Sequence, residues 1–428
     1  MNLLGAPLEF YLFGLTLLGV AVFHRRTLEV ALIGLGAILI YQGVWGVFPS
    51  GQGLGALGQH ALHEWVILTN ILLLLVGFGL LSNQFELSGL PDHLPGVLPD
   101  NWLGGLAMLA IVFVLSAFLD NIAAAIIGGT VAANVFSGRV HIGYLAAIVG
   151  ASNAGGSGSV VGDTTTTMMW IDGVDPLAVL PAYLAASVAL MVFGIPAALQ
   201  QHRHQPILAD ALPGTRIDWV CVAIVMAILV AAIGTNVLVN LYHPDLADQV
   251  PSIGLAVWAA IALAALLRRP DWAVVPEAAK GALFLLSLVL CASMMPVEHL
   301  PVASWQTALG LGFVSSVFDN IPLTKLALEQ GGYDWGFVAF AVGFGGSMVW
   351  FGSTAGVALS NQFAETRSVF SWIRHGWHVA LAYVVGFAVM LAVLGWHPHE
   401  PHKRSAVEIR ALCCADAGLK PADRALLS

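Results

Sequence analysis

Apolar runs long enough to cross a membrane recur along almost the whole chain, and this repetition constrains the fold more than any single motif. Of the 428 residues, 58% are hydrophobic and only 10% are charged, and the mean hydropathy is +0.84. Soluble domains carry about 25% charged residues. A helix needs about 20 apolar residues to cross the hydrocarbon core of a bilayer. The sequence therefore predicts an all-α polytopic membrane protein.

Ten spans are predicted from the apolar runs and the polar breaks between them. Met1 to Phe23 lacks the basic start and the small-residue cleavage site of a signal peptide. We therefore interpret this segment as the first span. The spans lie near residues 8–23, 28–48, 65–82, 142–171, 177–200, 218–241, 252–267, 281–296, 335–360 and 376–396.

Two further apolar stretches, residues 101–136 and 302–328, do not fit as single spans. Each carries an Asp-Asn pair near its middle, in "SAFLDNIAAAI" and "SSVFDNIPLTK". Each half has only about 12–18 residues, fewer than the roughly 20 that a span requires. We interpret each stretch as a re-entrant hairpin with its Asp-Asn pair at the tip.

The distribution of basic residues supports this topology, because short cytoplasmic loops collect Lys and Arg. With the N-terminus outside, the outer loops 49–64, 172–176, 242–251, 297–301 and 329–334 contain no Lys or Arg. Ten basic residues then fall on inner loops: Arg25, Arg26, Arg139, Arg203, Arg216, Arg268, Arg269, Lys280, Arg367 and Arg374. The topology places the C-terminal tail, which holds five more basic residues, outside.

The two hairpins are separated by five spans, an odd number, so they enter the membrane from opposite sides. The following segments also match: "GGSGSVVGDT" (155–164) aligns with "GGSMVWFGST" (345–354). These features predict an inverted repeat, which in secondary transporters places the binding site at the midplane. The predicted domains are residues 1–216, the inverted second repeat 217–396, and a polar tail 397–428.

Residues 142–171 would form a straight helix of about 45 Å at 1.5 Å per residue, too long for the bilayer core. We expect the glycines to break this helix, and the matching ones to break the helix over 335–360. A break frees backbone N–H and C=O groups, which is tolerated only where protein or water surrounds them. Freed carbonyls suit cations, and half-helix N-termini suit anions. The two breaks thus predict an ion or substrate cradle.

Three carboxylates, Asp120, Asp163 and Asp319, lie in these embedded segments. An ionised Asp at the bilayer centre costs about 2.5–3.5 kcal/mol on insertion scales, so it indicates a pathway or a partner. Protons and Na⁺ can compete for such a group, and this competition is the minimal chemistry of an antiporter. We therefore treat all three as candidate Na⁺ ligands. The structural alternative is that each Asp only caps a half-helix.

Lys325 places an ammonium group inside the second hairpin. One interpretation is a fixed counter-ion that replaces a coupling cation. The other is that it snorkels to the outer surface near Glu329 and anchors the hairpin.

The stretches "SAFLDNI" (116–122), "SNAGGSGSVVGDTTTTMMWI" (152–171), "SSVFDNIPL" (315–323) and "GFGGSMVWFGSTAGVA" (343–358) resemble the NhaD-type sodium/proton antiporters. That family lies within the ion-transporter superfamily that also holds arsenite, citrate and dicarboxylate carriers. The resemblance implies inverted repeats with hairpin tips and broken helices, a homodimer, and an elevator-like movement. Two positions depart from the family pattern: "GSVVGD" lacks an expected proline, and Lys325 replaces a neutral residue.

Carried over by position, together with the residue reading above, the resemblance implies an ion-binding set drawn from both halves. Lys325 is the possible counter-ion. The candidate residues are Asp120, Asn121, Asn153, Gly155, Gly156, Ser157, Asp163, Thr164, Asp319, Asn320, Thr324, Gly346, Ser347, Ser353 and Thr354.

The expected function is exchange of Na⁺ or Li⁺ for H⁺ by alternating access, in a multi-pass protein of a bacterial inner membrane. The expected partners are the lipid bilayer and monovalent cations, with no cofactor, no nucleic acid and no enzymatic activity. The main alternative is a cation- or proton-coupled carrier of a small anion such as citrate. An intramembrane aspartyl protease is disfavoured, because Val161-Gly162-Asp163 lacks a Gly two places before the Asp.

Overall fold

The computed structural model describes residues 2–3, 6–23, 26–48, 51–90, 98–207, 217–242, 249–296, 300–318 and 320–399. Asp319 and the tail beyond residue 399 therefore lie outside the described residues. The described residues form helices and loops, with two short antiparallel strand pairs. These pairs are β1 (Asn2–Leu3) with β2 (Ala6–Pro7), and β3 (Val47–Phe48) with β4 (Gly51–Gln52).

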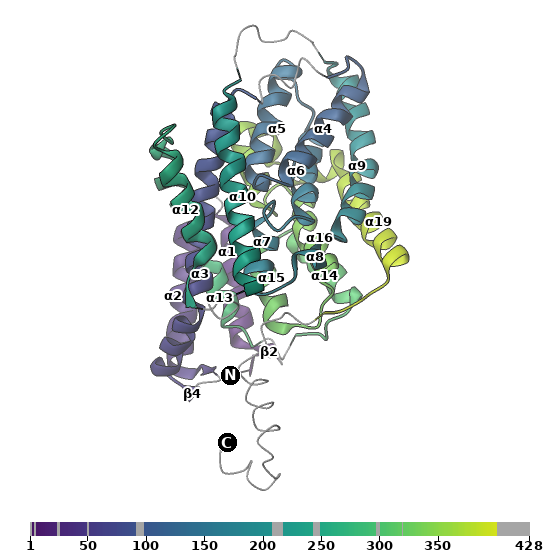
Figure 1. The fold of residues 1–428 in the computed structure, drawn as a ribbon. Coiled ribbons are helices and arrows are strands. Elements are labelled where there is room, and N and C mark those ends of the chain that lie inside the picture. Colours follow the sequence, from purple (N-terminus) through teal and green to yellow (C-terminus); the bar gives the residue numbers. More distant parts are fainter. Residues whose placement is uncertain are drawn as a thin grey trace.

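The helices pack into two bundles that lie side by side in Figure 1. We call the first the flanking bundle; it consists of α1 (Leu8–Val22), α2 (Thr27–Trp45), α3 (Leu54–Leu87), α10 (Trp219–Tyr242), α12 (Ser252–Ala264) and α13 (Val275–Ser293), with the 3₁₀ turn η2 (Trp272–Val274).

The second, the core bundle, consists of α4 (Trp102–Ser116), α5 (Asn121–Val135), α6 (Ile142–Ser157), α7 (Thr164–Ile171), α8 (Pro176–Val179), α9 (Ala182–His204), α14 (Trp305–Ser315), α15 (Asn320–Gln330), α16 (Trp335–Gly345), α17 (Thr354–Gln362), α18 (Val369–His375) and α19 (Trp377–Leu394), with the 3₁₀ turns η4 (Gly346–Met348) and η5 (Ala364–Arg367). The main contacts between the bundles join α3 and α13 to α5, α7 and α15.

The surface of the helices is suited to lipid. Five helical segments among the described residues are long and apolar enough to cross a membrane: Thr27–Trp45, Glu64–Phe85, Pro176–His204, Trp272–Ser293 and Trp377–Leu394. On α2, Ile33 and Ile40 are 72% and 71% exposed. Water would make such exposure costly, whereas hydrocarbon does not. The chain is a multi-pass membrane protein.

Both predicted helix breaks are present. α6 ends at Ser157 and α7 begins at Thr164, while α16 ends at Gly345 and α17 begins at Thr354 after the turn η4. The two stretches predicted as hairpins each form two short helices, α4 with α5 and α14 with α15. The predicted span 177–200 is divided, with α8 preceding α9.

Loops that the charge distribution places on one side of the membrane contact one another. The ring of His141 lies 5.4 Å from that of His204 and 5.2 Å from that of His375, and all three belong to predicted inner ends. At the opposite end, the amide of His399 donates to the carbonyl of Tyr333 over 3.0 Å. The start of the C-terminal tail therefore lies beside a predicted outer loop.

Each broken helix packs backbone to backbone against the first helix of a hairpin. A Cβ added at Gly155 would collide with the carbonyl of Phe113 in α4, and one at Gly345 would collide with the backbone of Gly312 in α14. Serine hydroxyls reinforce both contacts: Ser116 donates to the carbonyl of Ser152, and Ser315 donates to that of Val342 over 2.7 Å. The glycines therefore allow the broken helices to pack closely against the first helices of the predicted hairpins.

Replacing Gly155 or Gly345 with Ala should destabilise the core bundle, because the new methyl group meets backbone that cannot move aside. Overpacking of this kind costs about 1–3 kcal/mol. A lower melting temperature of the detergent-solubilised protein would measure the effect. Gly36→Ala in α2 is the matched control, since its Cβ would meet no atom within 4 Å; an equal loss of stability there would contradict the explanation.

Candidate functional site

The side-chain amide of Asn153, in the last turns of α6, joins the two broken helices. Its Nδ2 donates to Ser347 Oγ over 2.9 Å and to Ser353 Oγ over 3.1 Å. Its Oδ1 accepts from Asn121 Nδ2 over 3.0 Å. Asn153 is fully buried, so each of these bonds satisfies a group that water cannot reach. A single amide thus connects residues from both halves of the chain.

Asp163 lies beside this amide network and is only 1% exposed. Its Oδ2 accepts from Thr165 Oγ1 over 2.8 Å, and its Oδ1 accepts from Asn121 Nδ2 and from the Thr165 amide, each over 3.3 Å. Close approach of the opposite half is possible because residue 343 is glycine: a Cβ there would lie 2.9 Å from Asp163 Oδ2. The carboxylate is therefore held by donors from α5 and α7.

Among the residues that the structure describes, the side-chain oxygens of two asparagines at the predicted hairpin tips have no hydrogen-bond partner. They are Oδ1 of Asn121, at the start of α5, and Oδ1 of Asn320, at the start of α15. Both residues are 1% exposed. A buried oxygen without a donor has a free-energy cost, so an unpaired one requires an explanation such as a bound ion or water. Oxygen atoms are the ligands that hard cations prefer.

A partly open cavity with an empty volume of about 280 Å³ lies beside Asp163. Asp120 and Asp163 both line it, and the carboxylate of Asp163 acts electrostatically on that of Asp120. Apolar residues of α3 in the flanking bundle form the opposite wall. The lining residues are Ile71, Leu74, Leu75, Phe78, Asp120, Val161, Asp163, Thr164 and Thr167. The cavity therefore lies at the boundary between the two bundles.

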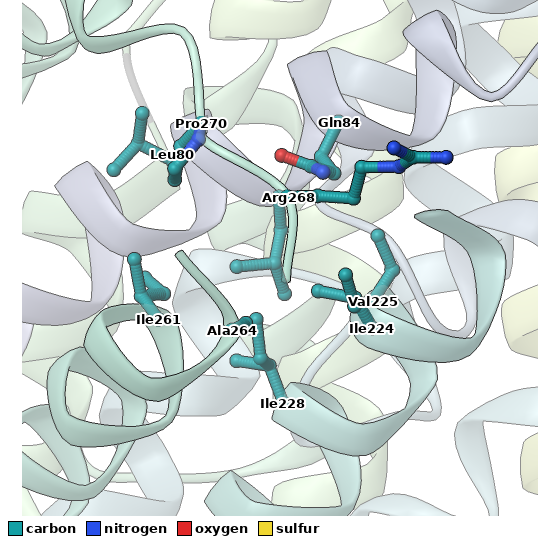
Figure 2. Close-up of a pocket in the computed structure, with 10 residues that line it drawn as sticks. Leu80, Gln84, Ile224, Val225, Ile228, Ile261, Ala264, Arg268 and Pro270 are labelled. Carbon is teal, nitrogen blue, oxygen red and sulfur yellow. The ribbon is translucent and has the colours of Figure 1, made fainter. Parts of the chain in front are cut away.

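A second cavity, of about 270 Å³, lies within the flanking bundle and has a different character. Figure 2 shows it between Leu80 of α3, Ile224 and Ile228 of α10, and Ile261 of α12. Its lining is mainly apolar and contains no carboxylate. Arg268, at its edge, pairs with Asp218 over 3.1 Å. We assign it no part in ion binding.

The structure brings together many of the residues predicted from the sequence. Asn121, Asn153, Asp163, Ser347 and Ser353 form one hydrogen-bonded network. Asp120 and Thr164 line the cavity beside it. Thr354 begins α17, directly after the Ser353 cap.

Other predicted residues serve the packing. Gly155 and Gly156 allow close backbone contacts, as does Gly346, whose added Cβ would lie 2.7 Å from the carbonyl of Gly352. Ser157 donates to the carbonyl of Ala154 over 2.8 Å, and Thr324 donates to that of Asn320 over 3.0 Å, so each bonds within its own helix.

Among the described residues, Lys325 has no bond to the network, and its side chain is buried. It is 2% exposed, and its Nζ lies 2.7 Å from Glu329 Oε1 and 3.1 Å from Glu64 Oε2. The sequence interpretation named Glu329 as a neighbour, but it missed Glu64 on α3. In the sequence, Glu64 is an isolated carboxylate at the edge of a predicted apolar span. This isolation is the signal that could have identified Glu64 as a functional residue.

The capping interpretation holds in part for Asp163. Its side chain accepts from the amide of Thr165 and so caps α7, but it also accepts from two side chains, those of Thr165 and Asn121. Thr165 was not predicted as a site residue, although its position two residues after the Asp is typical of a group that bonds a capping carboxylate. Asp163 is therefore both a cap and a member of the network.

Asn153→Ala should lower the stability of the protein, because it removes three hydrogen bonds and leaves Asn121, Ser347 and Ser353 short of partners. At about 0.5–1.5 kcal/mol for each bond, a loss of about 2 kcal/mol is expected. Thermal unfolding in detergent would measure it. Thr324→Val is the control, because Thr324 bonds only within α15; similar losses in both variants would argue against a bridging role.

No protein-family model matches this chain. The chain is 28% identical to sodium/proton antiporter 1 of Arabidopsis thaliana over 67% of this chain and 55% of that protein. It is 27% identical to sodium/proton antiporter 2 of the same plant over 68% of this chain and 76% of the relative.

A third match is short: 87 residues are 36% identical to the Na⁺/H⁺ antiporter NhaD of Halomonas elongata, which covers 19% of this chain and 18% of that protein. The chain thus spans little more than half the length of the first of these relatives. In these matched segments the chain is similar to three proteins named as sodium/proton antiporters, and the match to NhaD is partial.

Proposed function

We propose that this chain is a secondary active transporter that exchanges Na⁺ or Li⁺ for H⁺ by alternating access. The observation that carries the proposal is the pair of carboxylates, Asp120 and Asp163, lining one cavity beside the unpartnered oxygen of Asn121. The names of the three relatives, all sodium/proton antiporters, agree with this chemistry.

Exchange follows from competition for the same oxygens. A small cation takes carboxylate, amide and hydroxyl oxygens as ligands, and a proton occupies a carboxylate oxygen directly. Two neighbouring carboxylates repel each other when both are ionised, so binding of either a cation or a proton relieves the repulsion. The site binds one or the other, and this exclusion couples the two ion movements. Asp319 is proposed as the third carboxylate, because it precedes Asn320 in the sequence as Asp120 precedes Asn121.

An inverted repeat is proposed as the scaffold of this site, with residues 1–216 and 217–396 as its halves. Contacts that recur support it. The Ser116 bond to α6 matches the Ser315 bond to α16, and the Gly155 contact matches that of Gly345. Each half contributes three helices to the flanking bundle and the hairpin and broken helix to the core bundle. Such repeats are frequent in transporters, with the substrate bound between them.

Alternating access is proposed to occur by movement of the core bundle against the flanking bundle. The cavity has polar groups of the core bundle on one side and apolar residues of α3 on the other. Shifting one bundle past the other would move the apolar wall away from the site without dismantling the hydrogen-bond network. A homodimer and a location in a bacterial inner membrane remain part of the proposal and rest on the resemblance.

The rival function, transport of a small anion, depended on Lys325 as a positive charge at the site. Two carboxylates, Glu64 and Glu329, neutralise this ammonium, and it makes no bond to the network. The charged groups that line the cavity are both acidic. Cation transport therefore fits these groups better than anion transport does.

Asp163→Asn should abolish Na⁺-driven proton movement, since the amide cannot be ionised yet can still cap α7. The measurement is dequenching of a pH-sensitive dye on Na⁺ or Li⁺ addition to everted membrane vesicles. Asp175→Asn is the matched control, because Asp175 caps α8 at an exposed position. Full exchange by Asp163→Asn, or no exchange by the wild-type protein at any pH, would rule out this function.

Ser353→Ala should raise the Na⁺ concentration needed for half-maximal exchange. It removes an acceptor of Asn153 and the cap of α17, so the second half of the site loses its orientation. A lost cap costs about 1 kcal/mol, and we expect a shift approaching tenfold, equivalent to about 1.4 kcal/mol. Ser368→Ala removes an exposed serine cap from α18 and should change nothing; equal effects would contradict the assignment.

A further inference from the structure

A buried group of charges lies where α15 of the core bundle meets α3 of the flanking bundle. The ammonium of Lys325, 2% exposed, pairs with Glu64 from α3, whose side chain is 5% exposed. It also pairs with Glu329, one turn along its own helix and 32% exposed. The carboxylate of Asp172, which ends α7, acts electrostatically on the same ammonium. The cation thus has carboxylates on both bundles.

The two ion pairs of Lys325 differ in what they join. The pair with Glu329 lies within α15, and Asp172 also belongs to the core bundle. The pair with Glu64 crosses from one bundle to the other. A movement of the bundles can therefore separate Lys325 from Glu64 but leaves Glu329 and Asp172 with it.

This difference matters because a buried charge without a partner is very unfavourable. A lone inter-bundle pair would leave an isolated ammonium after separation, and the bundles would be held permanently. Because Glu329 moves with it, Lys325 stays paired in both positions. The cost of separation then falls mainly on Glu64, whose buried carboxylate loses the ammonium.

We propose that the Lys325–Glu64 ion pair is a reversible latch between the bundles, and that Glu329 holds the ammonium when the latch is open. The latch stabilises the arrangement in which α3 closes the cavity. Lys325 acts as a positioning residue: it sets the balance between two arrangements of the bundles and does not bind the transported ion. This inference rests on the proposed function in one respect, the relative movement of the bundles.

The test measures that balance directly. Val161 lines the cavity on the core-bundle side, opposite α3. A cysteine placed there, in a chain whose Cys221, Cys291, Cys413 and Cys414 are replaced by Ser, would be labelled with a membrane-impermeant thiol reagent. Right-side-out and everted vesicles give the labelling rate from each face, and their ratio reports the balance between arrangements.

Glu64→Gln should change this ratio, because the Lys325–Glu64 pair exists only in the latched arrangement. The substitution therefore destabilises the latched arrangement and leaves the unlatched one unaffected. Glu329→Gln is the matched control: it removes an equal charge from the same ammonium but from within α15. It should leave the ratio unchanged or move it the opposite way, since the unlatched arrangement depends more on Glu329. Glu64→Asp, which keeps the charge and shortens the side chain, should shift the ratio as Glu64→Gln does.

Shifts in the same direction for Glu64→Gln and Glu329→Gln, or an unchanged ratio in the Glu64 variants, would overturn the latch. Glu64→Asp decides the question if Glu64→Gln fails to insert. Labelling needs no transport, so dye dequenching on the same vesicles tests cation exchange separately. If the protein exchanges cations for protons but the Glu64 variants leave the labelling ratio unchanged, only the latch is rejected. If the Glu64 variants shift the labelling ratio but no exchange is measured, only the antiport function is rejected.

Discussion

The need to satisfy backbone groups inside a membrane governs the structure of this protein. Lipid offers no hydrogen bonds, so the interruptions after Ser157 and Gly345 are possible only because protein encloses them. The enclosure is built from backbone contacts with α4 and α14 that leave no room for a Cβ. The interrupted helices, the hairpins and the polar site are therefore one construction, and the flanking bundle provides its apolar boundary.

The two broken helices resume at aligned positions, Thr164 and Thr354, but the residues around the two breaks differ in chemistry. Where the first half has Asn153, the aligned position in the second is Gly343, and where the first has Asp163, the second has Ser353. The glycine leaves space for the carboxylate of the opposite half, and the serine accepts from its amide. The charge and the bridging amide thus come from one half, while the other supplies space and hydroxyl groups.

Most of the helical pattern could be predicted from the sequence, because apolar length, glycine clusters and Asp-Asn pairs act locally. Asn153, Ser347 and Ser353 were predicted as site residues through the resemblance, and the breaks at 158–163 and 346–353 were of the local kind. The partnership of Lys325 with Glu64 was not, because 261 positions separate them and no sequence motif joins them. Nor did the sequence indicate that α3 would wall the cavity, since its residues there are ordinary apolar ones.

The amide of Asn153 differs from the carboxylates near it in a way that bears on the whole cycle. An amide has no ionised form near neutral pH, so its bonds to Asn121, Ser347 and Ser353 persist whatever charge Asp163 carries. The amide of Asn153 maintains the shape of the site, whereas the carboxylate of Asp163 changes the charge of the site. Under the proposed exchange, the site empties and refills without losing the geometry that recognises the next ion.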